Sequence, residues 1–133
     1  MLFSALSLAL SALSSALPVA ALAPAAAVAV CFSPEEDCTA FAVDAIDRAE
    51  TQILINAYGL TTSSSTVEAL IRAKQRGVEV RLIADRTTPC GHNSGIGPLA
   101  RAGIPVWIDH SARIAHSKSM IIDGTATLTS SMN

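Results

Sequence analysis

A histidine and a lysine stand two residues apart in the segment HSKSMIID, residues 116–123. Residues two apart in a β-strand point to the same side, so His116 and Lys118 would present an imidazole and an ammonium together. A neutral imidazole can attack phosphorus and form a covalent phosphoenzyme, while a nearby cation neutralises the nonbridging oxygens. These two residues are therefore suited to the chemistry of phosphate esters. An isolated His-x-Lys on an edge strand, however, more often belongs to a solvated face without catalytic function.

Ser131 and Asn133 follow the next strand-like segment and are also two residues apart. A hydroxyl and an amide can donate hydrogen bonds to phosphate oxygens, so both are candidate phosphate-binding residues together with Lys118. Asp123 lies seven residues after His116, at an odd separation and in a turn. The alternation therefore favours a role in holding the turn or the backbone over a position beside the imidazole.

Hydrophobic periodicity predicts the elements that position these residues. Strands are expected at 27–32, 52–58, 78–85, 104–109, 116–123 and 125–129. Helices are expected at 33–51, 61–77 and 94–103. Strands that alternate with helices imply an α/β fold with parallel pairs, whereas a turn at Asp123 and Gly124 predicts an antiparallel hairpin. The expected fold is a mixed, largely parallel sheet flanked by helices.

The length and charge of the chain limit its partners. The 133 residues are enough for one domain, and 9 basic against 11 acidic residues give a net charge of −2. This charge excludes a general electrostatic attraction to nucleic acid, so phosphate binding requires a local patch. Most of the basic residues read as ordinary solvated surface, but the candidates for such a patch are Arg72, Lys74, Arg76, Arg81, Arg86, Arg101 and Arg113.

The first 30 residues contain no charged side chain. Residues 1–27 are predicted to be a signal peptide, cleaved after Ala21-Leu22-Ala23 or near Ala25 to Ala27. The alternative is a membrane anchor, but a spanning helix needs about 20 apolar residues and serines and prolines interrupt this run. The expected domain is then 28–133, in a secreted or periplasmic protein.

Export would place the close pair Cys31 and Cys38 in an oxidising compartment, where it can form a disulfide. Two unpaired cysteines are the alternative. Cys90 is then left as a free loop thiol. A metal site on Cys90 and His92 is disfavoured because two further nearby ligands are lacking.

The spacing His116-x-Lys118-x4-Asp123, with Ser130-Ser131-Met132-Asn133 after six more residues, resembles the His-Lys-Asp signature of the phospholipase D superfamily. Three further segments are similar in order and spacing to the small, secreted, single-motif endonucleases of that superfamily. They are FSPEEDCTAFAVDAIDRAETQILINAYGLT, ALIRAKQRGVEVRLIAD and AGIPVWID.

This resemblance implies a phosphodiesterase that hydrolyses nucleic acid, DNA or RNA, through a phosphohistidine. His116, Lys118 and Asp123 would be its catalytic residues, and Lys118, Ser131 and Asn133 would bind phosphate. The family requires no metal or other cofactor. A chain with one signature would work as a homodimer, with the active site at the interface and a His116 from each subunit.

Two alternatives stay open. The same motif also suits hydrolysis of phospholipid headgroups. Members of the family continue past the asparagine, so the domain at 28–133 is expected to be incomplete at its C-terminus. The chain would then be a truncated, inactive remnant if the lacking part is essential.

Overall fold

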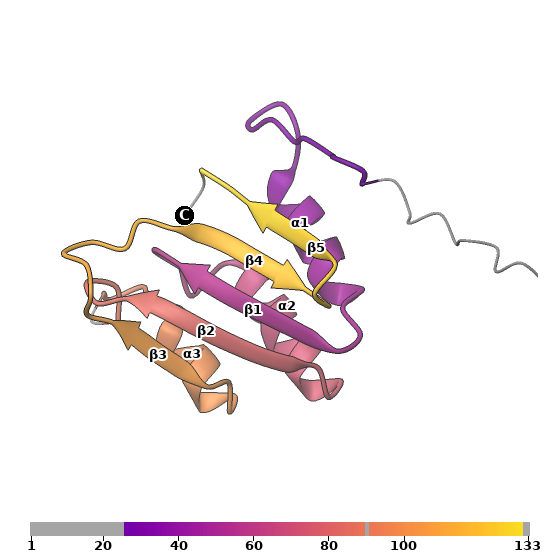
Figure 1. The fold of residues 1–133 in the computed structure, drawn as a ribbon. Helices are drawn as coiled ribbons and strands as arrows, with labels where there is room; N and C mark the ends of the chain where they lie inside the picture. The colour runs from indigo at the N-terminus through magenta and orange to yellow at the C-terminus, as the bar shows by residue number, and fades with distance from the viewer. Residues whose placement is uncertain (1–25, 90, 132–133) are drawn as a thin grey trace, which may run out of the picture.

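The computed structural model describes residues 26–89 and 91–131. Their helices and strands alternate along most of the chain (Figure 1). In chain order the elements are α1 (Cys38–Asp47), β1 (Gln52–Ala57), α2 (Ser65–Gln75), β2 (Glu79–Asp85), α3 (Ile96–Arg101), β3 (Val106–Asp109), β4 (Lys118–Ile122) and β5 (Ala126–Thr129).

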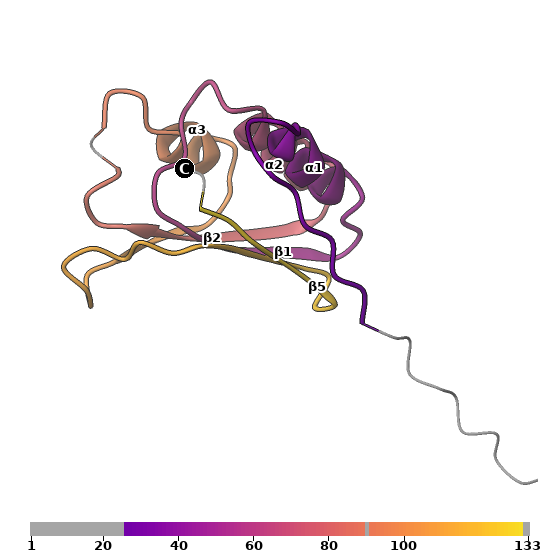
Figure 2. The same cartoon turned by 90° about the horizontal axis from the view of Figure 1, so that it is seen from above.

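The strands form one sheet in the order β3-β2-β1-β4-β5. β1, β2 and β3 pair in parallel, whereas β4 runs antiparallel to both β1 and β5. Figure 2 shows that α1, α2 and α3 all lie on one face of this sheet. The mixed α/β fold expected from the sequence is thereby confirmed.

The hydrophobic core lies between the helices and the sheet. Alternate residues of β1 and β2 point into it, so buried residues alternate with half-buried ones in β1 and with exposed ones in most of β2. α2 contributes Val67, Leu70 and two alanines. Its N-cap is Ser64, whose hydroxyl accepts a hydrogen bond from the backbone N–H of Thr66. Met120 and Ile122 of β4 belong to the same core. Lys118 has the same parity in β4 as these two residues, so the packing of Met120 and Ile122 sets the side of the sheet on which Lys118 lies.

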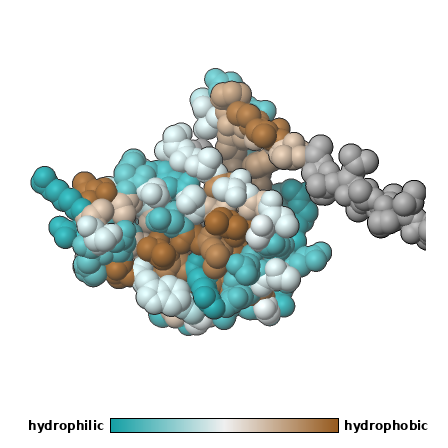
Figure 3. Space-filling view, viewed as in Figure 1, coloured by the Kyte–Doolittle hydropathy of each residue, from teal (hydrophilic) through white to brown (hydrophobic). Residues whose placement is uncertain are grey.

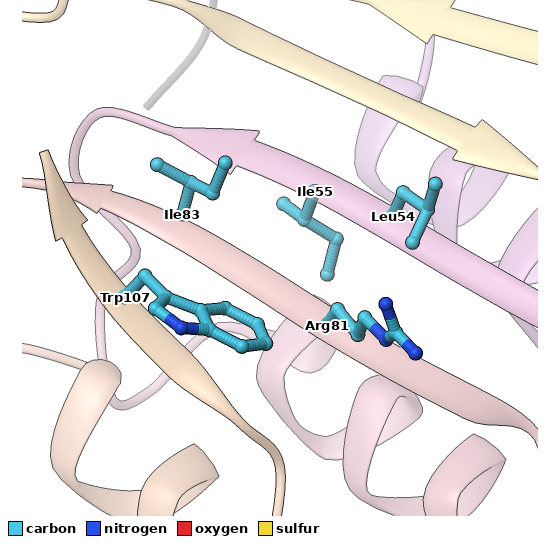
Figure 4. Close-up of a pocket in the computed structure, with 5 residues that line it drawn as sticks. All are labelled: Leu54, Ile55, Arg81, Ile83 and Trp107. Carbon is cyan, nitrogen blue, oxygen red and sulfur yellow. The ribbon is translucent and has the colours of Figure 1, made fainter.

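The second face of the sheet carries large side chains that the described residues leave open to solvent. Ile83, Trp107 and Ile121 are 44%, 52% and 41% exposed. Figure 3 shows apolar residues gathered on this face. In Figure 4, Leu54, Arg81, Ile83 and Trp107 surround a shallow depression between the strands.

The segment before α1 differs from the expectation. Residues 27–32 form no strand, because their backbone has no ladder partner among the described residues and Val28 is 88% exposed. Residues 33–36 form a turn instead of the first helical turn, and α1 begins after Asp37, whose carboxylate caps the N–H of Ala40. Local β propensity gave the wrong strand here because a strand needs a neighbour to satisfy its backbone.

The turn between β4 and β5 is the expected hairpin. Asp123 and Gly124 both have positive φ angles, 53° and 67°, and the N–H of Thr125 donates to the carbonyl of Ile122 at 3.1 Å. Within the part of the chain that the structure describes, no helix has the length and apolarity needed to cross a membrane.

Candidate active site

His116 and Lys118 lie at the end of the sheet where β1, β2 and β3 finish. Ligands of open α/β sheets commonly bind at this end. Lys118 pairs with Ala57, the last residue of β1, and the N–H of Tyr58 donates to the carbonyl of Ser117 at 2.8 Å. His116 is exposed and Lys118 is half-buried.

The two side chains point to the same side, as the alternation predicts. The Lys118 Nζ lies 3.1 Å from Nε2 and 3.4 Å from Nδ1 of His116. An ammonium can only donate, so a hydrogen bond here needs a ring nitrogen that accepts, and the tautomer decides which of the two nitrogens that is. A nucleophilic imidazole likewise needs one unprotonated ring nitrogen. Further along β4, Met120 and Ile122 are buried while Ile121 is 41% exposed, which confirms the predicted facing of the strand.

Tyr58 completes this group, and the sequence analysis assigned it no role. Its ring centroid lies 4.4 Å from that of His116, with the two planes tilted by 54°. The Lys118 Nζ is 5.0 Å from the same tyrosine centroid. The signal that could have found Tyr58 is its place directly after a buried strand, but only the pairing of β1 with β4 brings it to His116.

Asp85, at the end of β2, has a fully buried carboxylate. It accepts hydrogen bonds from the N–H and hydroxyl of Thr87, and from the N–H of Ala115 at 2.5 Å. The Thr87 hydroxyl, followed by the Ala115 N–H, lowers the pKa of Asp85 below its ordinary value, although burial opposes this shift. Ala115 directly precedes His116, so Asp85 anchors the backbone that carries the imidazole. Sequence reasoning missed this residue.

Asp123 does not join His116 and Lys118. Seven residues of extended chain separate it from His116, roughly 20 Å. Its carboxylate accepts hydrogen bonds from the backbone N–H groups of Glu50, Thr51 and Gln52 at 3.0, 2.7 and 3.0 Å. Asp123 thus ties the hairpin to the start of β1, the backbone role that the alternation favours. Its assignment as a catalytic residue stays a prediction.

Ser131 lies near the site, because the N–H of Ser130 donates to the carbonyl of Lys118 at 3.1 Å and continues the pairing of β5 with β4. Ser131 is exposed. Its contact with phosphate stays a prediction. Met132 and Asn133 lie outside the described residues, as does Cys90.

Residues 42–133 match the family model described as cardiolipin synthase, PLD-like domain, and this match spans more than half of the chain. The chain belongs to the phospholipase D superfamily. The matched residues include the His-x-Lys motif, whose Lys118 Nζ lies 3.1 Å from His116 Nε2.

Curated relatives carry names from the same superfamily. A phospholipase D from Rickettsia felis is 43% identical over 106 residues, which are 80% of this chain and 52% of that protein. A mitochondrial cardiolipin hydrolase from Xenopus tropicalis is 41% identical over 69 residues, 52% of this chain and 33% of that protein. The chain thus spans about half the length of the first relative.

Solved structures confirm the fold of this phospholipase D superfamily member. A phospholipase D family member, Nuc from Salmonella typhimurium, superposes with a TM-score of 0.69 and 35% identity, over 76% of this chain and 67% of that one. NucT from Helicobacter pylori has a TM-score of 0.59 and 22% identity, over 71% and 65% of the two chains, and supports the fold alone.

Cys31 and Cys38 form the expected disulfide, with Cα atoms 5.6 Å apart. Glu36 lies close enough to both sulfurs to suggest a cation site. Disulfide sulfurs are not thiolate ligands, however, and the Glu36 carboxylate accepts a hydrogen bond from the N–H of Phe32 at 2.6 Å. We therefore interpret this loop as a segment closed by a disulfide bond, not as a metal site.

Asp123→Asn is expected to lower the stability of this superfamily member at neutral pH and to reduce its sensitivity to acid. The N–H of Thr51, the largest contribution, lowers the pKa of Asp123. A carboxylate whose pKa is lower in the folded state stabilises the fold at pH values above the pKa of Asp in the unfolded chain, about 4. This stabilisation is lost progressively as the pH falls below about 4 toward the lower pKa of the folded state. Thermal melts from pH 7 to pH 2 would measure this.

Asp44→Asn is the matched control, because Asp44 forms an ion pair with Arg48 on an exposed face of α1. It should leave the acid dependence close to that of the wild type. A D123N variant whose melting temperature falls with acid as steeply as the wild type would contradict the role of Asp123.

Proposed function

We propose that this chain is a phosphodiesterase that hydrolyses nucleic-acid phosphodiester bonds through a covalent phosphohistidine on His116. The observation that carries the proposal is the 3.1 Å contact between the Lys118 ammonium and His116 Nε2, at an exposed position beyond the carboxyl ends of the parallel strands. A nucleophilic nitrogen and a fixed cation at this spacing would meet one phosphate group.

In the first step the lone pair of His116 attacks phosphorus. A P–N bond forms, the bond from phosphorus to the leaving oxygen breaks, and that oxygen takes a proton from a second imidazole. Lys118 neutralises the nonbridging oxygens while charge develops on them. In the second step the second imidazole takes a proton from water, the water oxygen attacks phosphorus, and the P–N bond breaks.

The second imidazole is proposed to be the His116 of another copy of the chain, in a homodimer. The signature supplies one such histidine per chain, and His116 is exposed where a second copy would reach it. Coupled imidazoles of this kind would give a bell-shaped pH profile for hydrolysis, with apparent pKa values that belong to the pair.

Exposed arginines around the site favour nucleic acid as the substrate. The hydrogen bond from Ala115 to Asp85 joins two segments, one carrying Arg86 and the other Arg113, and both arginines are exposed. Together with Lys118 they are proposed as the local basic patch that an acidic chain needs to bind a phosphate backbone. Ser131 and Asn133 are proposed to add hydrogen bonds to the same phosphate.

Phospholipid is the second candidate substrate. Relatives from Rickettsia felis and Xenopus tropicalis are named phospholipase D and cardiolipin hydrolase. Ile114, two residues before His116, is 53% exposed and would suit contact with acyl chains. Export to a secreted or periplasmic location is proposed for either substrate, and the disulfide between Cys31 and Cys38 supports it.

The test is to incubate the purified chain, with chelator present, with plasmid DNA, labelled RNA, and vesicles of phosphatidylcholine or cardiolipin. Cleavage of nucleic acid, together with acid-labile phosphate on His116 in quenched reactions, supports the proposal. Headgroup release without nucleic-acid cleavage would replace it with the lipid alternative. Inactivity on every substrate would refute both candidate functions.

A further inference from the structure

Tyr58, His116 and Lys118 form one compact cluster, which we call the Tyr58 cluster. The backbone bond from Tyr58 to Ser117 places the tyrosine beside the segment that carries the other two side chains. The tyrosine ring is in tilted contact with the imidazole at 4.4 Å between centroids, and the ammonium lies 5.0 Å from the ring centroid. All three side chains are thus within contact of one another.

From this geometry we infer that Tyr58 is a positioning residue, which sets the orientation of the His116 imidazole and the Lys118 ammonium for phosphoryl transfer. The inference rests on the proposed function. His116 precedes the first residue of β4 and is exposed, so neither the ladder nor the core fixes its ring. The tyrosine ring gives the imidazole a surface to pack against.

The same ring restrains the lysine. An aromatic face carries negative potential and attracts an ammonium within about 6 Å of its centroid. A lysine side chain has several rotatable bonds, so holding Nζ over the ring narrows the positions that it samples. Reaction rates depend steeply on such placement, and a displacement of about 1 Å can lower a rate about 100-fold.

Both contacts are made by the tyrosine ring, so variants that keep the ring can be distinguished from variants that remove it. Tyr58→Phe keeps the ring and should preserve the placement of His116 and Lys118. Tyr58→Leu removes the ring and should release both side chains. Phe41→Leu, on the exposed surface of α1, is the matched control for loss of an aromatic ring away from the site.

The variants of the full chain would be compared on bis(p-nitrophenyl) phosphate, a small soluble phosphodiester that favours neither nucleic acid nor lipid. For Y58L we expect kcat to fall about 10- to 100-fold with KM changed less than about threefold. Y58F should stay within about threefold of wild-type kcat. Proton NMR of the His116 ring should show a ring-current shift in wild type and Y58F that disappears in Y58L.

The outcomes separate this inference from the proposed function. A wild-type chain that cleaves no phosphodiester refutes the function, yet the NMR shifts still report whether Tyr58 orients His116. The inference is overturned if Y58L keeps wild-type kcat, if Y58F fails as badly as Y58L, or if the ring-current shift is the same in all variants. Should Y58L not fold, Tyr58→Thr serves as the ring-free variant.

Discussion

Replacing His116 by alanine is expected to lower phosphodiester hydrolysis by at least about 1,000-fold, because the change removes both the nucleophile and, in a homodimer, the general acid. The side chain is exposed and lies outside the core, so the free energy of unfolding should change by no more than about 0.5 kcal/mol. Steady-state rates and thermal melts of the purified variant would measure the two effects.

His92→Ala and His110→Ala are the matched controls, since both histidines are exposed. His92 lies on the loop before α3, and His110 lies at the start of the segment between β3 and β4, six residues before His116. Each should retain wild-type activity. An H116A variant within about tenfold of the wild-type rate would show that another group attacks phosphorus.

Mixing wild type with H116A tests the homodimer through the same residue. If one site needs an imidazole from each subunit, only dimers of two wild-type chains are active. An equimolar mixture with free exchange of subunits would then show about a quarter of the activity of wild type at equal total concentration. About half would indicate that each chain works alone.

Asp85→Asn is expected to reduce hydrolysis at least about tenfold and to lower the melting temperature by roughly 5 °C. The buried carboxylate accepts from Thr87 and from the N–H of Ala115. An amide of the same shape has only one accepting oxygen and would present hydrogens to these donors. The segment that carries His116 would then lose its anchor, so the imidazole would leave its place beside Lys118.

Asp109→Asn provides a closely matched control. Asp109 pairs with Asp85 in the register of the sheet and also ends its strand, but its carboxylate accepts from Ser111 in its own turn. This variant should keep activity within about twofold, since it does not touch the backbone before His116. Equal losses of activity in D85N and D109N would mean that the effect of Asp85 is general loss of stability.

The sequence determined the local parts of this protein. Period-two alternation placed His116 and Lys118 on one side and put Met120 and Ile122 into the core, since side-chain direction in a strand depends only on parity. Turn chemistry at Asp123 and Gly124 fixed the hairpin. A match of motif spacing indicated the superfamily, and the family model confirmed it.

Only the tertiary structure decided how distant segments meet. The order of strands puts β1 between β2 and β4, and this order brings Tyr58 to His116. The hydrogen bond from Ala115 to Asp85 joins residues 30 apart, and Asp123 accepts hydrogen bonds from residues more than 70 earlier. Such contacts depend on which elements pair and in which register, and local propensity carries no information about either. For the same reason residues 27–32, which have the pattern of a strand, form none without a neighbouring strand among the described residues.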